Sequence, residues 1–114
     1  MAYDRELADR IRELLSGEKG VTEQPMFGGL AFLINGNMSV SASRKGGLLV
    51  RMDPERGDAL VDGEHVQPMV MRGREMAGWL WVDGDTVRTP AGLAEWVERG
   101  VSHARSLPAK AGRR

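Results

Sequence analysis

The chain contains no cysteine, and this absence excludes several kinds of chemistry at once. Without thiols there is no disulfide bond, no thiolate ligand for a metal ion and no cysteine nucleophile. Aromatic residues are also few, at 5% of the sequence, whereas methionine occurs seven times. We therefore expect methionine, whose unbranched side chain adapts to irregular spaces, to fill part of the core.

Long hydrophobic runs are absent as well. The longest one covers residues 30–34, far short of the roughly 20 residues that a membrane-spanning helix needs. The N-terminal residues carry charge from Asp4 onward and show no apolar stretch of the signal-peptide kind. We therefore expect a cytoplasmic protein that has no membrane partner.

A surplus of charge of either sign is missing too. The 16 basic residues are balanced by 16 acidic residues, so the formal net charge is zero. Proteins that hold duplex DNA on their own usually carry a basic surplus, because neutralising phosphates supplies most of their non-specific affinity. The balance argues against a dedicated DNA-binding protein, although a local basic patch remains compatible with it.

The residues that are present fit one globular domain. A chain of 114 residues can bury roughly 65% of its unfolded surface in a single core. Hydrophobic residues make up 41% and charged residues 28%, which are the proportions of a folded protein. We expect one domain over residues 1–108, followed by a basic, disordered tail over residues 109–114.

Apolar stripes with helical spacing predict a helix at each end of the domain. The first begins after Asp4, a good N-cap, and the last begins at Thr89 and Pro90. A shorter helix is expected after Asp53 and Pro54, in the middle of the chain. The stripe residues that we expect to be buried are Leu7, Ile11, Leu14, Leu93, Trp96, Val97 and Val101.

Between the helices the apolar spacing changes to a period of two, which predicts strands. These strands are expected over residues 26–34, 38–43, 48–52, 66–71 and 76–82, with a turn over residues 83–85. Asn35–Gly36 is a strong hairpin signal, because both positions of a tight two-residue turn require positive φ. The predicted order, α-β-β-β-α-β-β-α, describes a two-layer α+β domain with a five-stranded antiparallel sheet.

The middle of the chain resembles a known family. Residues 26–38, Met-Phe-Gly-Gly-Leu-Ala-Phe-Leu-Ile-Asn-Gly-Asn-Met, are similar to the N-terminal domain of TfoX/Sxy proteins. Residues 49–54 and 71–79 resemble later blocks of small, stand-alone, actinobacterial-type members, so the similarity extends over residues 5–106. The resemblance implies a secretion-chaperone-like α+β fold.

The same resemblance implies a loose functional label. Full-length TfoX/Sxy proteins are bacterial regulators of natural competence that work with a cyclic-AMP receptor protein at promoters. They carry a second, C-terminal domain that these 114 residues do not include. The resemblance supplies no catalytic residues.

No pattern in the sequence is typical of a catalytic or cofactor site. Gly28 and Gly29 lie within a predicted strand, whereas a phosphate-binding glycine loop opens a helix. Neither histidine, His65 or His103, has a second histidine at ligand spacing, and we expect both to be solvated. We therefore expect no enzyme activity, no cofactor and no metal ion.

The remaining signals concern binding. Two tryptophans and a methionine-rich strand pair indicate a surface for a protein partner or for self-association, because these side chains adapt well at interfaces. The residues concerned are Trp79, Trp81, Met69, Met71 and Met76. We interpret the chain as a non-enzymatic protein-interaction module, with the link to transcription or competence regulation that the resemblance implies.

The alternative is a transcriptional regulator that binds nucleic acid. Basic residues occur at two predicted turns, where they could form a basic end of the sheet. These residues are Arg44, Lys45, Arg72 and Arg74. The sequence favours the protein-interaction module, because zero net charge gives no long-range steering toward phosphate.

Overall fold

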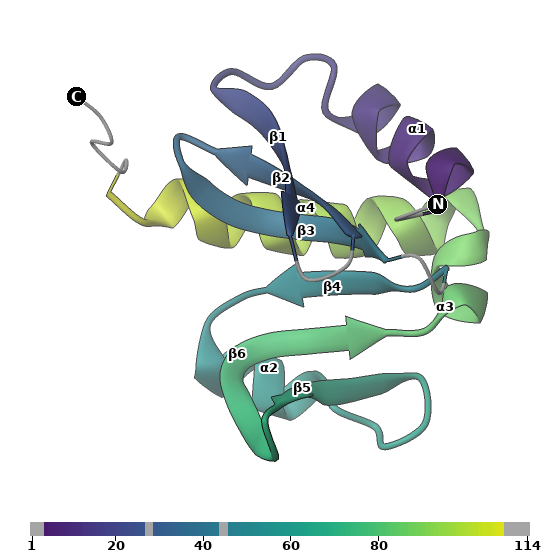
Figure 1. The fold of residues 1–114 in the computed structure, drawn as a ribbon, viewed down its shortest axis with the longest axis vertical. Helices are drawn as coiled ribbons and strands as arrows, with labels where there is room; N and C mark the ends of the chain where they lie inside the picture. Colours follow the sequence, from purple (N-terminus) through teal and green to yellow (C-terminus); the bar gives the residue numbers. More distant parts are fainter. Residues whose placement is uncertain (1–3, 27–28, 44–45, 109–114) are drawn as a thin grey trace.

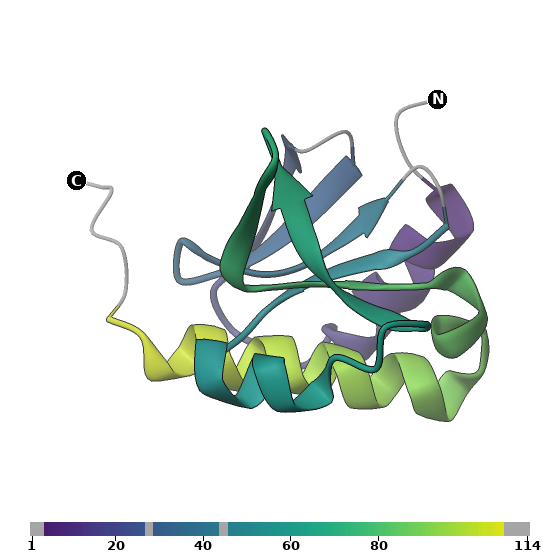
Figure 2. The same cartoon turned by 90° about the horizontal axis from the view of Figure 1, so that it is seen from below.

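Helices lie along one face of a single antiparallel sheet in the computed structural model, which describes residues 4–26, 29–43 and 46–108 (Figure 1, Figure 2). In chain order the elements are α1 (Arg5–Leu14), β1 (Val21–Met26), β2 (Gly29–Ile34), β3 (Asn37–Ser43), β4 (Leu48–Arg51), α2 (Pro54–Leu60), β5 (Val66–Met71), β6 (Arg74–Val82), α3 (Gly84–Arg88) and α4 (Pro90–Ser106). None of the helices in the described ranges is long and apolar enough to cross a membrane.

Within the described residues the sheet has six strands, in the order β1-β2-β3-β4-β6-β5, and every neighbouring pair is antiparallel. The predicted α+β class with an antiparallel sheet is therefore confirmed, with six strands in place of five. The additional strand is β1, whose four central residues are all exposed. A strand at a sheet edge can be polar on both faces, so β1 shows no apolar alternation.

Two of the hairpins, β2–β3 and β5–β6, have tight two-residue turns between their strands. Asn35 and Gly36, between β2 and β3, have φ values of 53° and 85°, which confirms the predicted two-residue turn. Arg72 and Gly73, between β5 and β6, have φ values of 55° and 78° and form a second turn of this kind. Positive φ at both central positions gives the turn a twist that matches the twist of the flanking strands.

The main core lies between the helices and the sheet. Six of the seven stripe residues predicted to be buried are buried, and Leu14, with 43% of its surface exposed, is the exception. In α1 the buried residues are Leu7, Ala8 and Ile11, and Leu15 follows directly after the helix. At 100° per residue Leu14 lies at the margin of this stripe, so it faces solvent beside the core.

Helix α4 packs closely on the middle of the sheet. A Cβ atom at Gly100 would lie 2.6 Å from the Ser39 carbonyl oxygen and 2.7 Å from a methyl carbon of Val40. The glycine therefore allows the helix backbone to approach β3 more closely than any side chain would permit. This contact fixes the distance between the two layers.

Helix α3 occupies a segment for which the sequence predicts only a turn. Asp83 accepts a hydrogen bond from the backbone N–H of Thr86 at 2.9 Å, and this bond caps the first turn of the helix. Thr89 both ends α3 and caps α4, through a bond from the Gly92 N–H at 3.0 Å. Five residues carry too few apolar positions to show helical spacing, so only the cap residues signal α3.

Candidate functional site

We call the face of the sheet away from the helices the open face (Figure 2). This face carries a second apolar cluster. Ala31, Met38 and Leu49 are buried at its centre. The half-buried side chains packed around them are Met26, Leu33, Met69 and Trp79. We call these seven residues the open-face patch. It matters for function because none of the described helices covers it, so its outer side chains remain accessible.

Two features of the strands produce this patch. Leu49 and Trp79 alternate with Val50 and Leu80, so that each of these strands directs one apolar residue to the core and the next to the open face. In β3 the register shifts near Ser39, and this β-bulge turns Met38 to the open face. The Ser39 hydroxyl donates to the Phe32 carbonyl at 2.7 Å, which satisfies the buried group.

Two of the residues predicted to form an interaction surface belong to the patch, and a third lies beside it. Trp79 lies across from Arg51, whose guanidinium carbon is 5.5 Å from the centre of a Trp79 ring. Trp81 pairs with Leu49, a patch residue, and its ring fills the space that a side chain at Gly47 would need. A Cβ at Gly47 would approach that ring to 2.4 Å. The strand register therefore brings both tryptophans to the open face.

The methionines predicted to form an interaction surface lie in different surroundings. Met69 packs in the open-face patch and also lines a hollow of about 290 Å³ together with Trp81. Met76 is half-buried in β6 and lines a separate hollow beside Trp79. The side chain of Met71 lies outside the described part of the chain. The sequence analysis missed five patch residues, Met26, Ala31, Leu33, Met38 and Leu49. For those in β2 and β4 a signal was present, because strands that are apolar at successive positions have two covered faces.

The predicted basic residues do not form a described cluster. Arg72 and Arg74 are exposed at the tip of the β5–β6 hairpin. Arg44 and Lys45 lie outside the described residues. The nearest described residue after them, Gly46, lies beside Gly84, just beyond the other end of β6. A basic end of the sheet shared by all four residues therefore stays a prediction.

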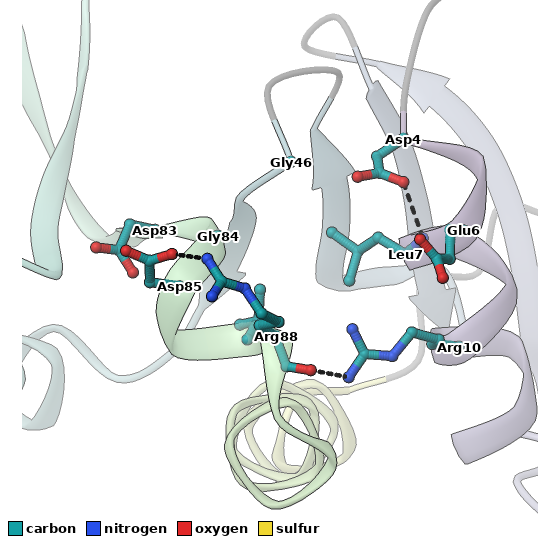
Figure 3. A pocket seen from close by; sticks show the side chains of 10 residues that line it. Asp4, Glu6, Leu7, Arg10, Gly46, Asp83, Gly84, Asp85 and Arg88 are labelled. Atoms are coloured by element: carbon teal, nitrogen blue, oxygen red, sulfur yellow. Dashed lines mark hydrogen bonds and ion pairs between the residues drawn. The ribbon is translucent and has the colours of Figure 1, made fainter.

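A cleft of about 390 Å³ lies where the beginnings of α1 and α3 meet (Figure 3). Several of its polar groups are already engaged in contacts within or between the helices. Asp4 accepts from the Leu7 N–H at 3.0 Å and Asp85 pairs with Arg88. Arg10 donates to the Arg88 carbonyl at 3.0 Å, which links the two helices. These contacts are helix caps and connections, so the cleft has a structural role.

His65 is held in an ion pair. Its Nδ1 lies 2.6 Å from a carboxylate oxygen of Asp83, and this hydrogen bond raises the pKa of His65. Partial burial raises the pKa of Asp83, but the hydrogen bonds from His65 and Thr86 outweigh it, so the pKa lies below its usual value. The pair connects the start of β5 to the cap of α3. Among the described residues, no group of three or more histidine, aspartate or glutamate side chains is placed to hold a metal ion.

His103 occupies a different environment. It lines a groove of about 410 Å³ between α2 and α4 that also includes Arg56, Arg99 and Ser102. Partial burial and the positive charge of Arg51 lower the pKa of His103. The groove contains acidic residues as well, Asp53 and Glu98, so its charges largely balance. His103 therefore lies in a groove of mixed charge, whereas His65 is paired with a carboxylate.

The fold and the helix-free face define a two-layer α+β domain with one open sheet surface. The family model of the TfoX N-terminal domain matches residues 13–104, which is most of the chain. The chain therefore belongs to the TfoX N-terminal domain family, as the resemblance indicated. No curated protein and no solved structure matches the chain.

Proposed function

We propose that this domain is a non-enzymatic protein-interaction module whose binding surface is the open-face patch. The observation that carries the proposal is an apolar cluster, half-buried at its margin, on a sheet face without a described helix. A single antiparallel sheet often leaves one face to water, and that face is then polar. Here the corresponding face carries methionine, leucine and tryptophan, the residues of an interface.

The chemistry of the patch suits a protein partner. Each Å² of apolar surface removed from water contributes about 25 cal/mol, so covering the margins of Leu33, Met69 and Trp79 favours association. Tryptophan is enriched among the residues that dominate binding energies. Methionine adapts its shape to the partner. We place this activity in the bacterial cytoplasm and link it to transcription or competence regulation, as expected from the TfoX/Sxy proteins.

Photo-crosslinking from the patch tests the proposal. A photoreactive phenylalanine analogue replaces Met69 in the patch, or Glu95 on the exposed side of α4 as the control. We expect position 69 to form one discrete protein adduct in host cells and position 95 to form none. Adding Trp79→Ala should lower the yield about 30-fold, since truncating an interface tryptophan costs about 2 kcal/mol of binding. Equal labelling from both positions would contradict the proposal.

A second candidate is nucleic-acid binding through the β5–β6 tip. Arg72 and Arg74 are exposed there and take part in none of the ion pairs formed among the described residues. Two arginines can neutralise about two phosphates, which supports only weak, salt-sensitive binding. The open-face patch is therefore the stronger candidate.

A further inference from the structure

The two edges of the sheet differ in their capacity to accept another strand. At the β5 edge, Val66 already donates to the Asp62 carboxylate at 2.8 Å. Its carbonyl accepts from the N–H groups of Asp62 and Gly63 at 3.1 and 3.2 Å. Pro68, two residues further along, has no N–H group. The β5 edge is therefore closed to strand addition over its first half.

The β1 edge is open. The Asn35 N–H donates to the Gly20 carbonyl at 3.0 Å, so Val21 and Ile34 form a non-hydrogen-bonded pair. By alternation, Val21 and Glu23 direct their N–H and C=O groups away from β2. Among the described residues, β1 pairs with β2 alone, and its central residues are exposed. Val21 and Glu23 therefore present donors and acceptors to an incoming strand.

We propose that a second copy of this chain pairs with β1 in antiparallel fashion, about a twofold axis at Thr22, so that the two sheets become continuous. In this register Val21 lies opposite the partner's Glu23 and Thr22 lies opposite the partner's Thr22. Every outward N–H of Val21 and Glu23 in both copies then has a carbonyl acceptor. The inference rests on the proposed interaction role but uses a different surface.

Charge and side-chain type select this register and this partner. A pairing centred on Glu23 would place two carboxylates directly opposite each other, which is destabilising, whereas threonine pairs across strands are favourable. Thr22 and Gln24 on the open side are polar and exposed, which suits another polar edge better than an apolar peptide.

The helix side of the edge is also self-complementary. Arg12 holds Glu23 with hydrogen bonds of 2.7 and 2.8 Å and contacts Asp9 at 2.6 Å. Arg12 and the two carboxylates that it contacts thus lie beside the edge, so a twofold-related copy meets charges of both signs. Because the axis is perpendicular to the sheet, the two open-face patches lie on the same side of the dimer.

The absence of cysteine allows a direct test by disulfide formation. In the proposed dimer the two Thr22 Cα atoms lie about 4.5 Å apart, within the span that a disulfide bridges. The two Gln24 Cα atoms lie about 14 Å apart, beyond that span. We expect purified Thr22→Cys to form a covalent dimer under mild oxidation, and Gln24→Cys, the matched control, to remain uncrosslinked. Equal crosslinking of both variants, or none in either, overturns the proposal.

A backbone substitution gives a second measurement. Glu23→Pro removes an outward N–H, and Pro25 shows that proline fits β1 in this orientation. We expect sedimentation to show a dimer for the wild-type chain and for Glu23→Ala, and a folded monomer for Glu23→Pro. A monomeric wild-type chain, or a dimeric Glu23→Pro, overturns the proposal. Trp79→Ala should leave Thr22→Cys crosslinking unchanged, which separates a failure of the dimer from a failure of the open-face patch.

Discussion

Gly36 occupies the second position of the β2–β3 turn with φ of 85°, a conformation that residues with a Cβ rarely adopt. Gly36→Val should therefore destabilise the domain by about 1–3 kcal/mol. Urea unfolding followed by circular dichroism measures the change. Gly17→Ala is the control, because Gly17 has no positive φ and a Cβ placed there would meet no atom within 4 Å. An unchanged midpoint for Gly36→Val would mean that the turn tolerates a β-branched residue.

The His65–Asp83 pair makes stability depend on pH. The pKa of His65 in the folded state is raised above its ordinary value of 6.5. The contribution of protonated His65 to stability is therefore fully present below pH 6.5, and it is lost as the pH rises through the raised pKa. On the acid side the pKa of Asp83 is lowered, so the contribution of the carboxylate is lost as the pH falls through that lowered value.

His65→Gln should accordingly lower the melting temperature most on the acid side of 6.5, and the difference from the wild-type chain should shrink at alkaline pH. Titration by NMR gives a direct check, with the pKa of His65 above 6.5 and that of His103 below it. Asp83→Asn should return the pKa of His65 toward its ordinary value. A difference in melting temperature that does not vary with pH would show that the ion pair adds nothing to stability.

Single residues were predictable from the sequence where the signal is local. The turn at Asn35–Gly36 and the caps at Asp4, Asp53 and Thr89 were all identified correctly, because each depends on residues within one turn of the chain. The partner of His65 was not predictable, since Asp83 lies eighteen residues away along the chain and is brought close by strand pairing.

At the scale of elements, the strands and helices with an apolar period were predicted and two others were not. Strand β1 was missed because an exposed edge strand has no buried face and therefore no apolar alternation. Helix α3 was missed because five residues are too few to show the apolar spacing by which a helix is identified. The open-face patch was partly predicted. The tryptophans were visible in β6, but the contribution of Met38 depends on a bulge that no local pattern announces.

The tip of the β5–β6 hairpin separates the two functional hypotheses. Zero net charge gives no long-range attraction to phosphate. With only two exposed arginines, the logarithm of the binding constant should fall with the logarithm of the salt concentration with a slope of about two. We expect a mobility-shift titration at low salt to show no binding at micromolar protein. Arg72→Ala with Arg74→Ala should leave the adduct formed at position 69 unchanged. Micromolar DNA binding that this double substitution abolishes would replace the interaction proposal with nucleic-acid recognition.

At the scale of the whole molecule, one helical layer on one sheet leaves both an open face and an open edge. The patch and the β1 edge are different surfaces, one apolar and formed by side chains, the other polar and formed by the backbone. Pairing through β1 would place two patches side by side, so that a partner with two sites binds with greater avidity than either patch alone provides. The proposed dimer thus strengthens the proposed interaction without altering its contacts.

Helices α2 and α4 each carry a glycine that faces the rest of the core, and these two glycines should respond oppositely to alanine. A Cβ at Gly100 of α4 would lie 2.6 Å from the Ser39 carbonyl oxygen, which belongs to the backbone and cannot move aside alone. Gly100→Ala should therefore destabilise the domain by about 1–3 kcal/mol, because the helix must shift away from the sheet.

A Cβ at Gly57 of α2 would meet Met52 and Leu80 only at 3.5 Å and beyond, an ordinary contact. Gly57→Ala should stabilise the domain by up to about 1 kcal/mol through helix propensity. Urea unfolding of both variants measures the difference, and a change of the same sign in both would show that close helix approach does not control the packing of this domain.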